Sequence, residues 1–218
     1  MRLNLCSGPN LFPGWINVDK VDQTPYIQIL REAGDVSSWP EAQQKLVEHV
    51  KADRIQFYTH DARERLPFDD NSIEAIYLGQ CVEHFNRGYE LPGILKECLR
   101  VLKPTAPIRI TTPDLQLLLD SALAGTLDRF THEQPEFFAN ALPEDRLSYL
   151  MFGAMGPRCT MENYEGHFHL FTERSLTLAL REAGFNNVYC PDVSVCHAFR
   201  DVVDCGMSHS LAAEAVKP

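Results

Sequence analysis

The sequence has no long hydrophobic run and no excess of positive charge. No apolar stretch approaches the ~20 residues that a membrane-spanning helix needs, and the N-terminal segment MRLNLCSGPN contains no apolar core of a signal peptide. The 30 acidic residues outnumber the 20 Lys and Arg residues, which gives a formal net charge of −10. Because nucleic-acid backbones and anionic membranes attract clustered Lys and Arg, we expect neither a nucleic-acid nor a membrane partner.

The chain also lacks paired cysteines. Its seven cysteines are odd in number, and none of them belongs to a C-x-x-C pair. This pattern argues against a zinc ribbon and against a disulfide framework. It favours reduced thiols, and therefore a cytoplasmic protein.

Short apolar runs alternate with stretches of helical periodicity. The runs predict strands at residues 2–6, 15–18, 54–59, 73–78 and 108–112, with one or two final strands in 188–199. The helical stretches are residues 41–50, 91–102 and 172–184. Strands that alternate with helices predict an α/β fold with a mostly parallel sheet and helices on both faces. The 218 residues, 44% of them hydrophobic, suit one domain with an insert, or two small domains at most.

Polar and acidic residues follow most of the predicted strands. In open parallel sheets, ligands bind beyond the carboxyl ends of the strands. Gly8, after the first strand, lets backbone approach a ligand closely. Asp19, after the second, can accept hydrogen bonds from a ribose diol, and Asp61, after the third, can accept from an exocyclic amine. Each could be an ordinary turn residue, but their order predicts a nucleoside site.

Signals for phosphate binding are absent from this edge of the sheet. There is no G-x-x-x-x-G-K-[ST] segment, and LNLCSG is not a G-x-G-x-x-G fingerprint. The first two strands are also too close in sequence for a crossover helix, which needs about 10–12 residues or more. We therefore expect a nucleoside without phosphate, which disfavours a nicotinamide-dependent oxidoreductase.

Four segments carry motifs in a recognisable order: RLNLCSGPNLFPGWINVD, HDARERLPFDDNSIEAIYLGQCVEHF, LPGILKECLRVLKPTAPIRITTPDL and GHFHLFTERSLTLALREAGF. Together they resemble the class I S-adenosylmethionine-dependent methyltransferases. The nearest subgroup is the small predicted methyltransferases, type 11-like, with a G-W-x-N-x-D segment near the N-terminus. The resemblance covers roughly residues 2–115 and 165–190.

The resemblance implies a seven-stranded Rossmann-like sheet with S-adenosylmethionine bound across the strand tips. Carried over position by position, it implies that Cys6, Ser7 and Gly8 wrap the amino-acid moiety of the cofactor, Asp19 holds the ribose hydroxyls, Asp61 and Ala62 contact adenine, and Gly79 and Gln80 border the sulfonium. The chain departs from the family pattern at three places. Cys6 replaces the first Gly of the first motif, Glu74 replaces an Asp, and Thr105 with Ala106 replaces a Gly-Gly pair.

The candidate catalytic residues are His84, Asp114 and His167. Methyl transfer is an in-line displacement, so the protein mainly aligns the reactants, and a general base is needed when the acceptor is a hydroxyl or a protonated amine. His84 is the first candidate for that base; alternatively, Glu83 and His84 cap the following loop. Asp114 either orients the acceptor or caps the next helix.

The pair His167 and His169 flanks Phe168, so in an extended segment both imidazoles face one side. That side is interpreted as the acceptor pocket. A metal site completed by Glu83, His84 and Asp114 is the alternative, but nothing in the spacing demands it, and the prediction is that no metal is bound.

Residues 1–205 are expected to form one methyltransferase domain. Within it, residues 115–165 are rich in Phe, Leu and Met and predict a helical insert over the acceptor site; the alternative is helices that complete the core. Residues 206–218 are expected to form a loose tail.

The acidic balance and the absence of a [DN]-P-P-[FY] segment favour a small-molecule or saccharide acceptor. The oligomeric state stays open, with a homodimer among the options. Two other functions also stay open: a catalytically inactive scaffold with the same fold, and a metal-dependent hydrolase that uses the His and acidic residues.

Overall fold

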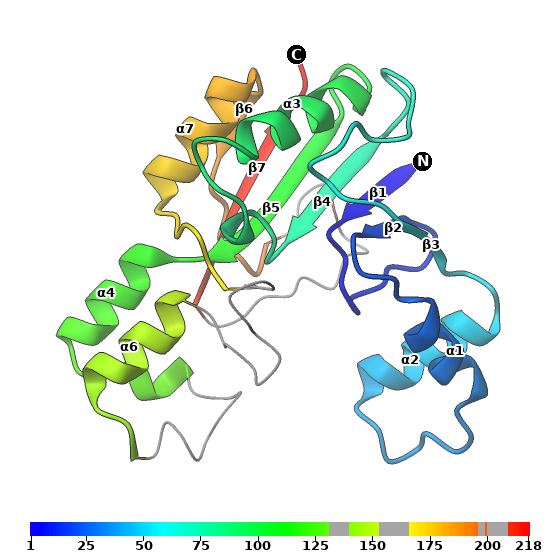
Figure 1. The fold of residues 1–218 in the computed structure, drawn as a ribbon, viewed down its shortest axis with the longest axis horizontal. Coiled ribbons are helices and arrows are strands. Elements are labelled where there is room, and N and C mark those ends of the chain that lie inside the picture. Colours follow the sequence, from blue (N-terminus) through cyan, green and yellow to red (C-terminus); the bar gives the residue numbers. More distant parts are fainter. Residues whose placement is uncertain (131–139, 153–165, 196–198, 200–208) are drawn as a thin grey trace.

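The computed structural model of the protein describes residues 1–130, 140–152, 166–195, 199 and 209–218. Its strands form one seven-stranded sheet in the order β3-β2-β1-β4-β5-β7-β6 (Figure 1). The strands are β1 Arg2–Leu5, β2 Ile16–Asp19, β3 Gln56–Thr59, β4 Ala75–Gly79, β5 Pro107–Pro113, β6 Asn186–Tyr189 and β7 Ser210–Val216. The strands from β3 to β5 pair in parallel, and β7 pairs antiparallel with both β5 and β6. The mostly parallel, seven-stranded sheet expected from the sequence is confirmed.

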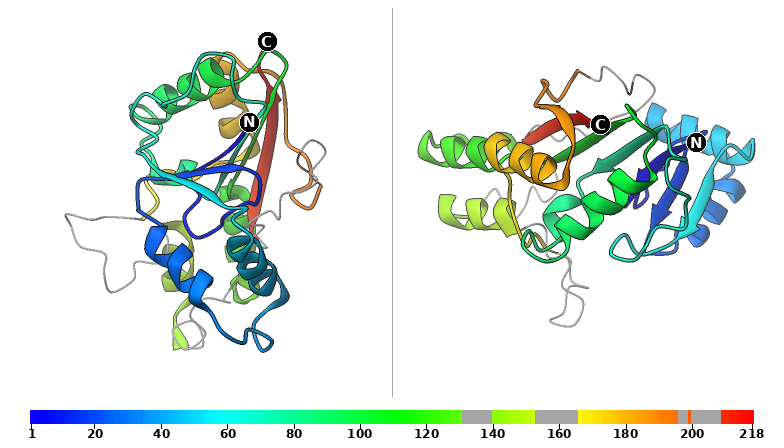
Figure 2. Two further views of the ribbon diagram at one scale, coloured as in Figure 1. Left: turned by 90° about the vertical axis from the view of Figure 1, so that its right-hand side faces the viewer. Right: turned by 90° about the horizontal axis from the view of Figure 1, so that it is seen from above.

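The helices are α1 Thr24–Glu32, α2 Glu41–Lys51, α3 Leu91–Val101, α4 Leu115–Leu123, α6 Pro143–Phe152 and α7 Glu173–Ala183, with short 3₁₀ turns η1 Val82–His84 and η2 Leu127–Phe130. Helices α3 and α7 lie beside each other on one side of the sheet, and α1 and α2 lie on the other (Figure 2). The connection between the parallel neighbours β1 and β2 contains no helix, as their spacing predicted. None of the helices in the described part of the chain combines the length and apolarity that crossing a membrane requires.

Strand β4 shows how the sheet is buried on both faces. Ile76 and Leu78 pack into the main core together with side chains of α3 and α7. The intervening Tyr77 faces the other way, where it packs against Phe12 and Trp15 of the β1–β2 loop. Alternate side chains of a strand point to opposite faces, so the continuous apolar run of β4 is the signature of a central parallel strand.

The prediction of a loose tail at residues 206–218 is wrong for its described part, residues 209–218. Residues Ser210–Val216 form β7, which lies between β5 and β6 and is buried along almost its whole length. Its sequence, SLAAEAV, has small apolar residues and a carboxylate instead of a strong apolar run. The carboxylate of Glu214 can be buried because the buried Arg109 opposite it neutralises its charge. The strands expected within 188–199 reduce to β6, which ends at Tyr189; residues 196–198 lie outside the described residues.

Helix α1 is not among the helices that the sequence predicted. Pro25 stands in its first turn. Backbone N–H groups in the first turn of a helix have no intrahelical acceptor, so a proline there costs no hydrogen bond. Pro25 therefore helps to start this helix.

Helices are observed in the described part of the segment 115–165, at α4, η2 and α6. Leu118, Leu127, Phe130 and Leu150 form a small apolar cluster between them, separate from the main core. Residues 131–139 and 153–165 lie outside the described residues. The role of this segment as a cover over the acceptor stays a prediction.

Candidate active site

One buried asparagine holds the loop between β1 and β2. The Asn17 side-chain oxygen accepts hydrogen bonds from the Phe12 amide at 2.7 Å and the Asn4 side chain at 2.9 Å. Its amide nitrogen donates to the carbonyls of Phe12 (3.1 Å), Trp15 (3.3 Å) and Gln56 (3.0 Å). Buried polar groups must be paired in this way, so Asn17 determines the path of the loop. Asn17 is the Asn of the G-W-x-N-x-D segment, and its role in the loop was not predicted from the sequence.

Asp19 joins the ends of β1 and β2. One carboxylate oxygen accepts a hydrogen bond from the Gly8 amide at 2.8 Å, and the other accepts from the Val21 amide at 2.8 Å. Gly8 has φ +50°, a left-handed conformation that glycine adopts at little cost. Each carboxylate oxygen has a second lone pair, so Asp19 can support the loop and still accept from a ribose diol.

Two strand tips carry left-handed backbone at residues other than glycine. Cys6 has φ 57° after β1, and Gln80 has φ 49° after β4. Such a conformation costs of order 1–3 kcal/mol and gathers at functional sites. At Cys6 it explains the family preference for glycine: the turn keeps the conformation that glycine favours even though the residue is a cysteine.

These strand tips surround a single cavity of about 530 Å³. Its walls include six of the eight residues that the resemblance implied for cofactor binding: Cys6, Gly8, Asp19, Asp61, Ala62 and Gln80. The same cavity is lined by His84, Phe85, Glu90 and Phe168. The structure therefore brings the predicted nucleoside-binding residues and the first candidate base together at the carboxyl edge of the sheet.

The other two predicted cofactor residues are near the cavity but do not line it. Ser7 is buried, and its amide donates to the Val18 carbonyl at 3.0 Å. Gly79 packs against Tyr77: a Cβ at this position would lie 2.6 Å from the tyrosine ring. The glycine is thus required by close packing within the sheet.

Asp61 has a partner that sequence reasoning missed. Its carboxylate oxygens accept hydrogen bonds from Arg63 Nε at 3.0 and 3.1 Å and from Arg63 Nη2 at 2.6 Å. The hydrogen bond from the guanidinium is the main reason that the pKa of Asp61 is lowered. Arg63 also reaches Glu90 at 3.3 Å, and both residues line the cavity. An amine that binds Asp61 must share the carboxylate with Arg63.

His84 lies at the rim of the cavity, at the end of η1. Its ring is half-exposed, and Nδ1 is 3.2 Å from the Gly166 carbonyl. A carbonyl can only accept, so Nδ1 carries the proton and Nε2 carries the lone pair. The His84 ring also meets the His167 ring edge-on at a centroid distance of 5.1 Å.

Glu83 is buried beneath His84. One carboxyl oxygen accepts a hydrogen bond from the Thr112 hydroxyl at 3.1 Å. The other, Oε1, has no hydrogen-bond partner among the described residues and lies 4.0 Å from His84 Nε2. Burial raises the pKa of Glu83 to about 8, so that the carboxyl group holds a proton at neutral pH. Glu83 does not line the cavity itself, but its neighbour His84 does.

The two histidines of the GHFHLF segment have different surroundings. His167 Nδ1 is 3.0 Å from the Met151 carbonyl, and burial followed by the nearby His84 lowers its pKa to about 4. His169 packs on Phe171 with a ring distance of 4.6 Å. His167 therefore belongs with His84, whereas His169 is placed by packing against an apolar ring.

Asp114 adopts the structural alternative. Its side chain caps α4, accepting from the amides of Gln116 at 2.9 Å and Leu117 at 3.3 Å. It is not among the described residues that line the main cavity. Among the described residues, no contact of Asp114 supports a role in catalysis.

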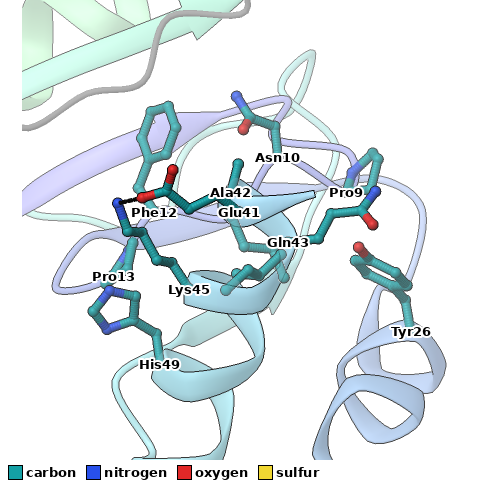
Figure 3. Close-up of a pocket in the computed structure, with 12 residues that line it drawn as sticks. Pro9, Asn10, Phe12, Pro13, Tyr26, Glu41, Ala42, Gln43, Lys45 and His49 are labelled. Carbon is teal, nitrogen blue, oxygen red and sulfur yellow. Dashed lines mark ion pairs between the residues drawn. The ribbon is translucent and has the colours of Figure 1, made fainter. Parts of the chain in front are cut away.

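A second cavity of about 760 Å³ lies between the β1–β2 loop and helices α1 and α2 (Figure 3). It is lined by Pro9, Phe12 and Pro13 of the loop, Tyr26 of α1, and a row of α2 side chains that ends at His49. Two of its charged residues, Glu41 and Lys45, are exposed and form an ion pair with each other, with Lys45 Nζ 2.6 Å from Glu41 Oε1. The described lining contains no converging set of reactive groups, so the smaller cavity at the strand tips is the better candidate site.

The sequence and fold were compared with known proteins. Residues 30–110 match the family described as a methyltransferase domain. This match, over somewhat more than a third of the chain, supports the resemblance to the class I S-adenosylmethionine-dependent methyltransferases. No curated protein matches the sequence significantly.

Three solved structures illustrate the likeness of the fold to known proteins. The PH0226 protein from Pyrococcus horikoshii OT3 shares 15% identity over 100% of this chain and 83% of that chain, with a TM-score of 0.50. A chain of the complex between the Haloferax volcanii Trm112 methyltransferase activator and the putative methyltransferase shares 13% identity over 99% and 81%, with a TM-score of 0.50. The CurJ carbon methyltransferase shares 13% over 99% and 47%, also with a TM-score of 0.50. At these identities the likeness concerns the fold.

The main cavity fits the cofactor of this family, S-adenosylmethionine. Its volume of about 530 Å³ lies within the range of small-ligand sites. The carboxylates of Asp19 and Asp61 stand at the ends of β2 and β3, where a nucleoside presents its hydroxyls and its exocyclic amine. Left-handed backbone at Cys6 and Gly8 turns the intervening loop around the cavity.

Proposed function

We propose that the protein transfers a methyl group from S-adenosylmethionine to an oxygen or nitrogen of a small-molecule or saccharide acceptor. The observation that carries the proposal is the shared cavity: six predicted cofactor residues line it together with His84 and Phe168. A cofactor site alone would also suit an inactive scaffold. An imidazole at the rim of the same cavity favours an enzyme.

The residues that line the cavity are assigned to the parts of the cofactor as follows. Cys6 and Gly8 hold the amino-acid moiety, Asp19 the ribose hydroxyls, Asp61 and Ala62 the adenine, and Gln80 the region of the sulfonium. Arg63 joins this set because it fixes the orientation of the Asp61 carboxylate. Ser7 and Gly79 support the site from behind, through the sheet backbone and through packing on Tyr77.

The acceptor side is formed by His84, with Phe168 as an exposed apolar wall. When bound, S-adenosylmethionine supplies an electrophilic methyl group whose carbon–sulfur bond breaks with its electron pair on sulfur. His84 takes the proton of the acceptor on Nε2, because its Nδ1 proton is held by the Gly166 carbonyl. His167 supports this role by keeping a second neutral imidazole against the ring of His84.

The acidic balance of the chain, with 30 acidic and 20 basic residues, supports an acceptor without a phosphate backbone. A cytoplasmic location is part of the proposal, since Cys6, Cys81, Cys98 and Cys190 are free thiols. Cys159, Cys196 and Cys205 lie outside the described residues.

The test measures S-adenosylhomocysteine release in the presence of hydroxylated and amine-bearing small molecules, including sugars. Wild type and His84→Gln are compared, with His49→Gln as the control because His49 lies in the second cavity. We expect His84→Gln to lower kcat by about 10²–10⁴ while the affinity for S-adenosylhomocysteine is unchanged. Cofactor binding without transfer to any acceptor would favour the scaffold instead.

A further inference from the structure

Three side chains with metal-binding donors converge beside the main cavity, and one of them, His84, lines it. Glu83, His84 and His167 each place one donor atom within 4.8 Å of the other two. They come from two segments that are far apart in sequence, the η1 turn and the GHFHLF segment. His169 and Asp114, which the sequence suggested as further ligands, are not in this cluster.

The backbone holds these two segments together. The amides of Phe168 and His169 donate to the Glu83 carbonyl at 2.8 and 3.2 Å. The His167 amide donates to the Phe152 carbonyl at 2.9 Å, which fixes the same segment against α6. The three donors are thus placed by main-chain hydrogen bonds, and a site built on a fixed backbone loses little entropy when it binds an ion.

Both imidazoles are oriented as metal ligands usually are. His84 Nδ1 bonds to the Gly166 carbonyl at 3.2 Å, and His167 Nδ1 bonds to the Met151 carbonyl at 3.0 Å. A ligating histidine almost always donates its other ring N–H to a carboxylate or backbone carbonyl, which sets the tautomer and the direction of the ring. In both residues this leaves Nε2 as the unprotonated nitrogen.

Glu83 supplies the third donor. Its exposed fraction is 1%, and Oε1 has no hydrogen-bond partner among the described residues. A buried polar atom left unpaired is costly, and a cation that displaces the carboxyl proton and binds Oε1 would remove that cost. The Thr112 hydroxyl holds the other oxygen at 3.1 Å and so orients the carboxyl group, as outer hydrogen bonds do at metal sites.

We propose that Glu83, His84 and His167 bind a divalent transition-metal ion, with Zn²⁺ as the best match to the ligands. Two histidines and one glutamate form a known catalytic zinc ligand set, which leaves a coordination position open. Donors around tetrahedral zinc lie about 3.3–3.5 Å apart, so binding draws the three side chains together. The His84 ring is half-exposed, so its packing restrains it less than that of a buried side chain.

The place of this site deepens the proposed function, on which this step rests. His84 lines the cofactor cavity, so an ion bound to His84 would lie at the wall of that cavity, within reach of an acceptor. A divalent ion lowers the pKa of a hydroxyl group that it binds, and the proton leaves to solvent. The ion then replaces His84 in activating the acceptor, and the acceptor class narrows to hydroxylated compounds that are methylated on oxygen.

The test is metal binding by the purified, chelator-treated full chain, measured by calorimetry with Zn²⁺ and by visible absorption with Co²⁺. We expect one ion per chain, and a loss of affinity of at least ~100-fold in Glu83→Gln and His167→Gln. His169→Gln is the matched control and should bind like wild type. Absence of saturable binding, or equal binding by all variants, would overturn the site.

Two further measurements keep the result interpretable. X-ray absorption of the Zn²⁺-loaded wild type should show nitrogen and oxygen at about 2.0–2.2 Å; sulfur at about 2.3 Å would assign the ion to cysteines and reject the proposal. S-adenosylhomocysteine binding is measured on the metal-free chain and on each variant. Retained cofactor binding without metal binding would reject the metal site alone, whereas loss of cofactor binding in wild type would reject the proposed function.

Discussion

Arg109 of β5 and Glu214 of β7 stand directly opposite each other and form a buried ion pair with a 2.7 Å contact. The guanidinium also donates to the carbonyls of Val193 at 2.8 Å and Val195 at 3.0 Å. The Tyr189 hydroxyl donates to the second oxygen of Glu214 at 2.5 Å. One charged pair therefore connects β5, β7, β6 and the segment that follows β6.

Glu214→Ala should destabilise the fold strongly, because the removal of one partner leaves the other charge buried. The expected loss is about 3–5 kcal/mol of unfolding free energy, measured by urea titration. The comparison variant is Glu74→Ala, since Glu74 pairs with Lys103 at an exposed position. A surface pair contributes far less, so similar losses in the two variants would contradict a structural role for the buried pair.

Asp19→Ala should weaken S-adenosylhomocysteine binding by at least ~10-fold, which corresponds to about 1.4 kcal/mol. The change removes the ribose acceptor and also releases the Gly8 amide, which Asp19 holds at 2.8 Å. Calorimetry gives the affinity. Asp22→Ala is the control because Asp22 is outside the cavity lining; unchanged affinity in Asp19→Ala would place the ribose elsewhere.

Asn17→Leu should lower the unfolding free energy by about 2–4 kcal/mol, because several buried groups lose their hydrogen-bond partner at once. Affinity for the cofactor should fall as well, since the loop that Asn17 holds leads into the cavity. Gln56→Ala is the matched control: it keeps the backbone carbonyl that accepts from Asn17 and alters only an exposed side chain. Equal stability of the two variants by urea titration would show that the buried network is dispensable.

Thr105→Gly should stabilise the protein by about 1 kcal/mol. Thr105 has φ 65° in the turn before β5, and this left-handed conformation is unfavourable for a β-branched side chain. Asn187→Gly, at φ 51°, should give a smaller gain because asparagine tolerates the same conformation. Thermal unfolding compares both variants with wild type, and a lower melting temperature for Thr105→Gly would mean that the hydroxyl or methyl group has a compensating contact.

Local patterns predicted the strands and helices whose signals lie within a few residues. Thr172 caps α7 and Gly184 ends it with φ 104°, as the sequence indicated. The elements that were missed depend on distant partners. The carboxylate of β7 is compatible with a buried strand only because Arg109 stands opposite Glu214. Helix α1 begins with a proline, and in sequence a proline marks the start of a helix and the interruption of one equally well.

In the candidate site, too, features set by local sequence could be predicted and features set by distant partners could not. Strand-end residues such as Asp19 and Asp61 could be placed from sequence, because parallel strands present their carboxyl ends at one edge. Side-chain partners could not be predicted from sequence. The contact of Arg63 with Asp61 depends on the rotamer of Arg63, and Asn17 binds backbone carbonyls that any residue would offer. For Asp114 the sequence left two interpretations, and the helix amides it accepts from favour the cap.

The position of β7 has a consequence for synthesis of the chain. The ribosome makes β5 and β6 before residues 210–216 have left the exit tunnel, yet β7 must lie between them. Until then β5 has an open edge, a known hazard for wrong pairing, and the Arg109 charge lacks its carboxylate. The nascent protein can thus assemble β1 to β5 early, but its sheet closes only after translation has passed β7, which makes that last step the point where chaperones have most to protect.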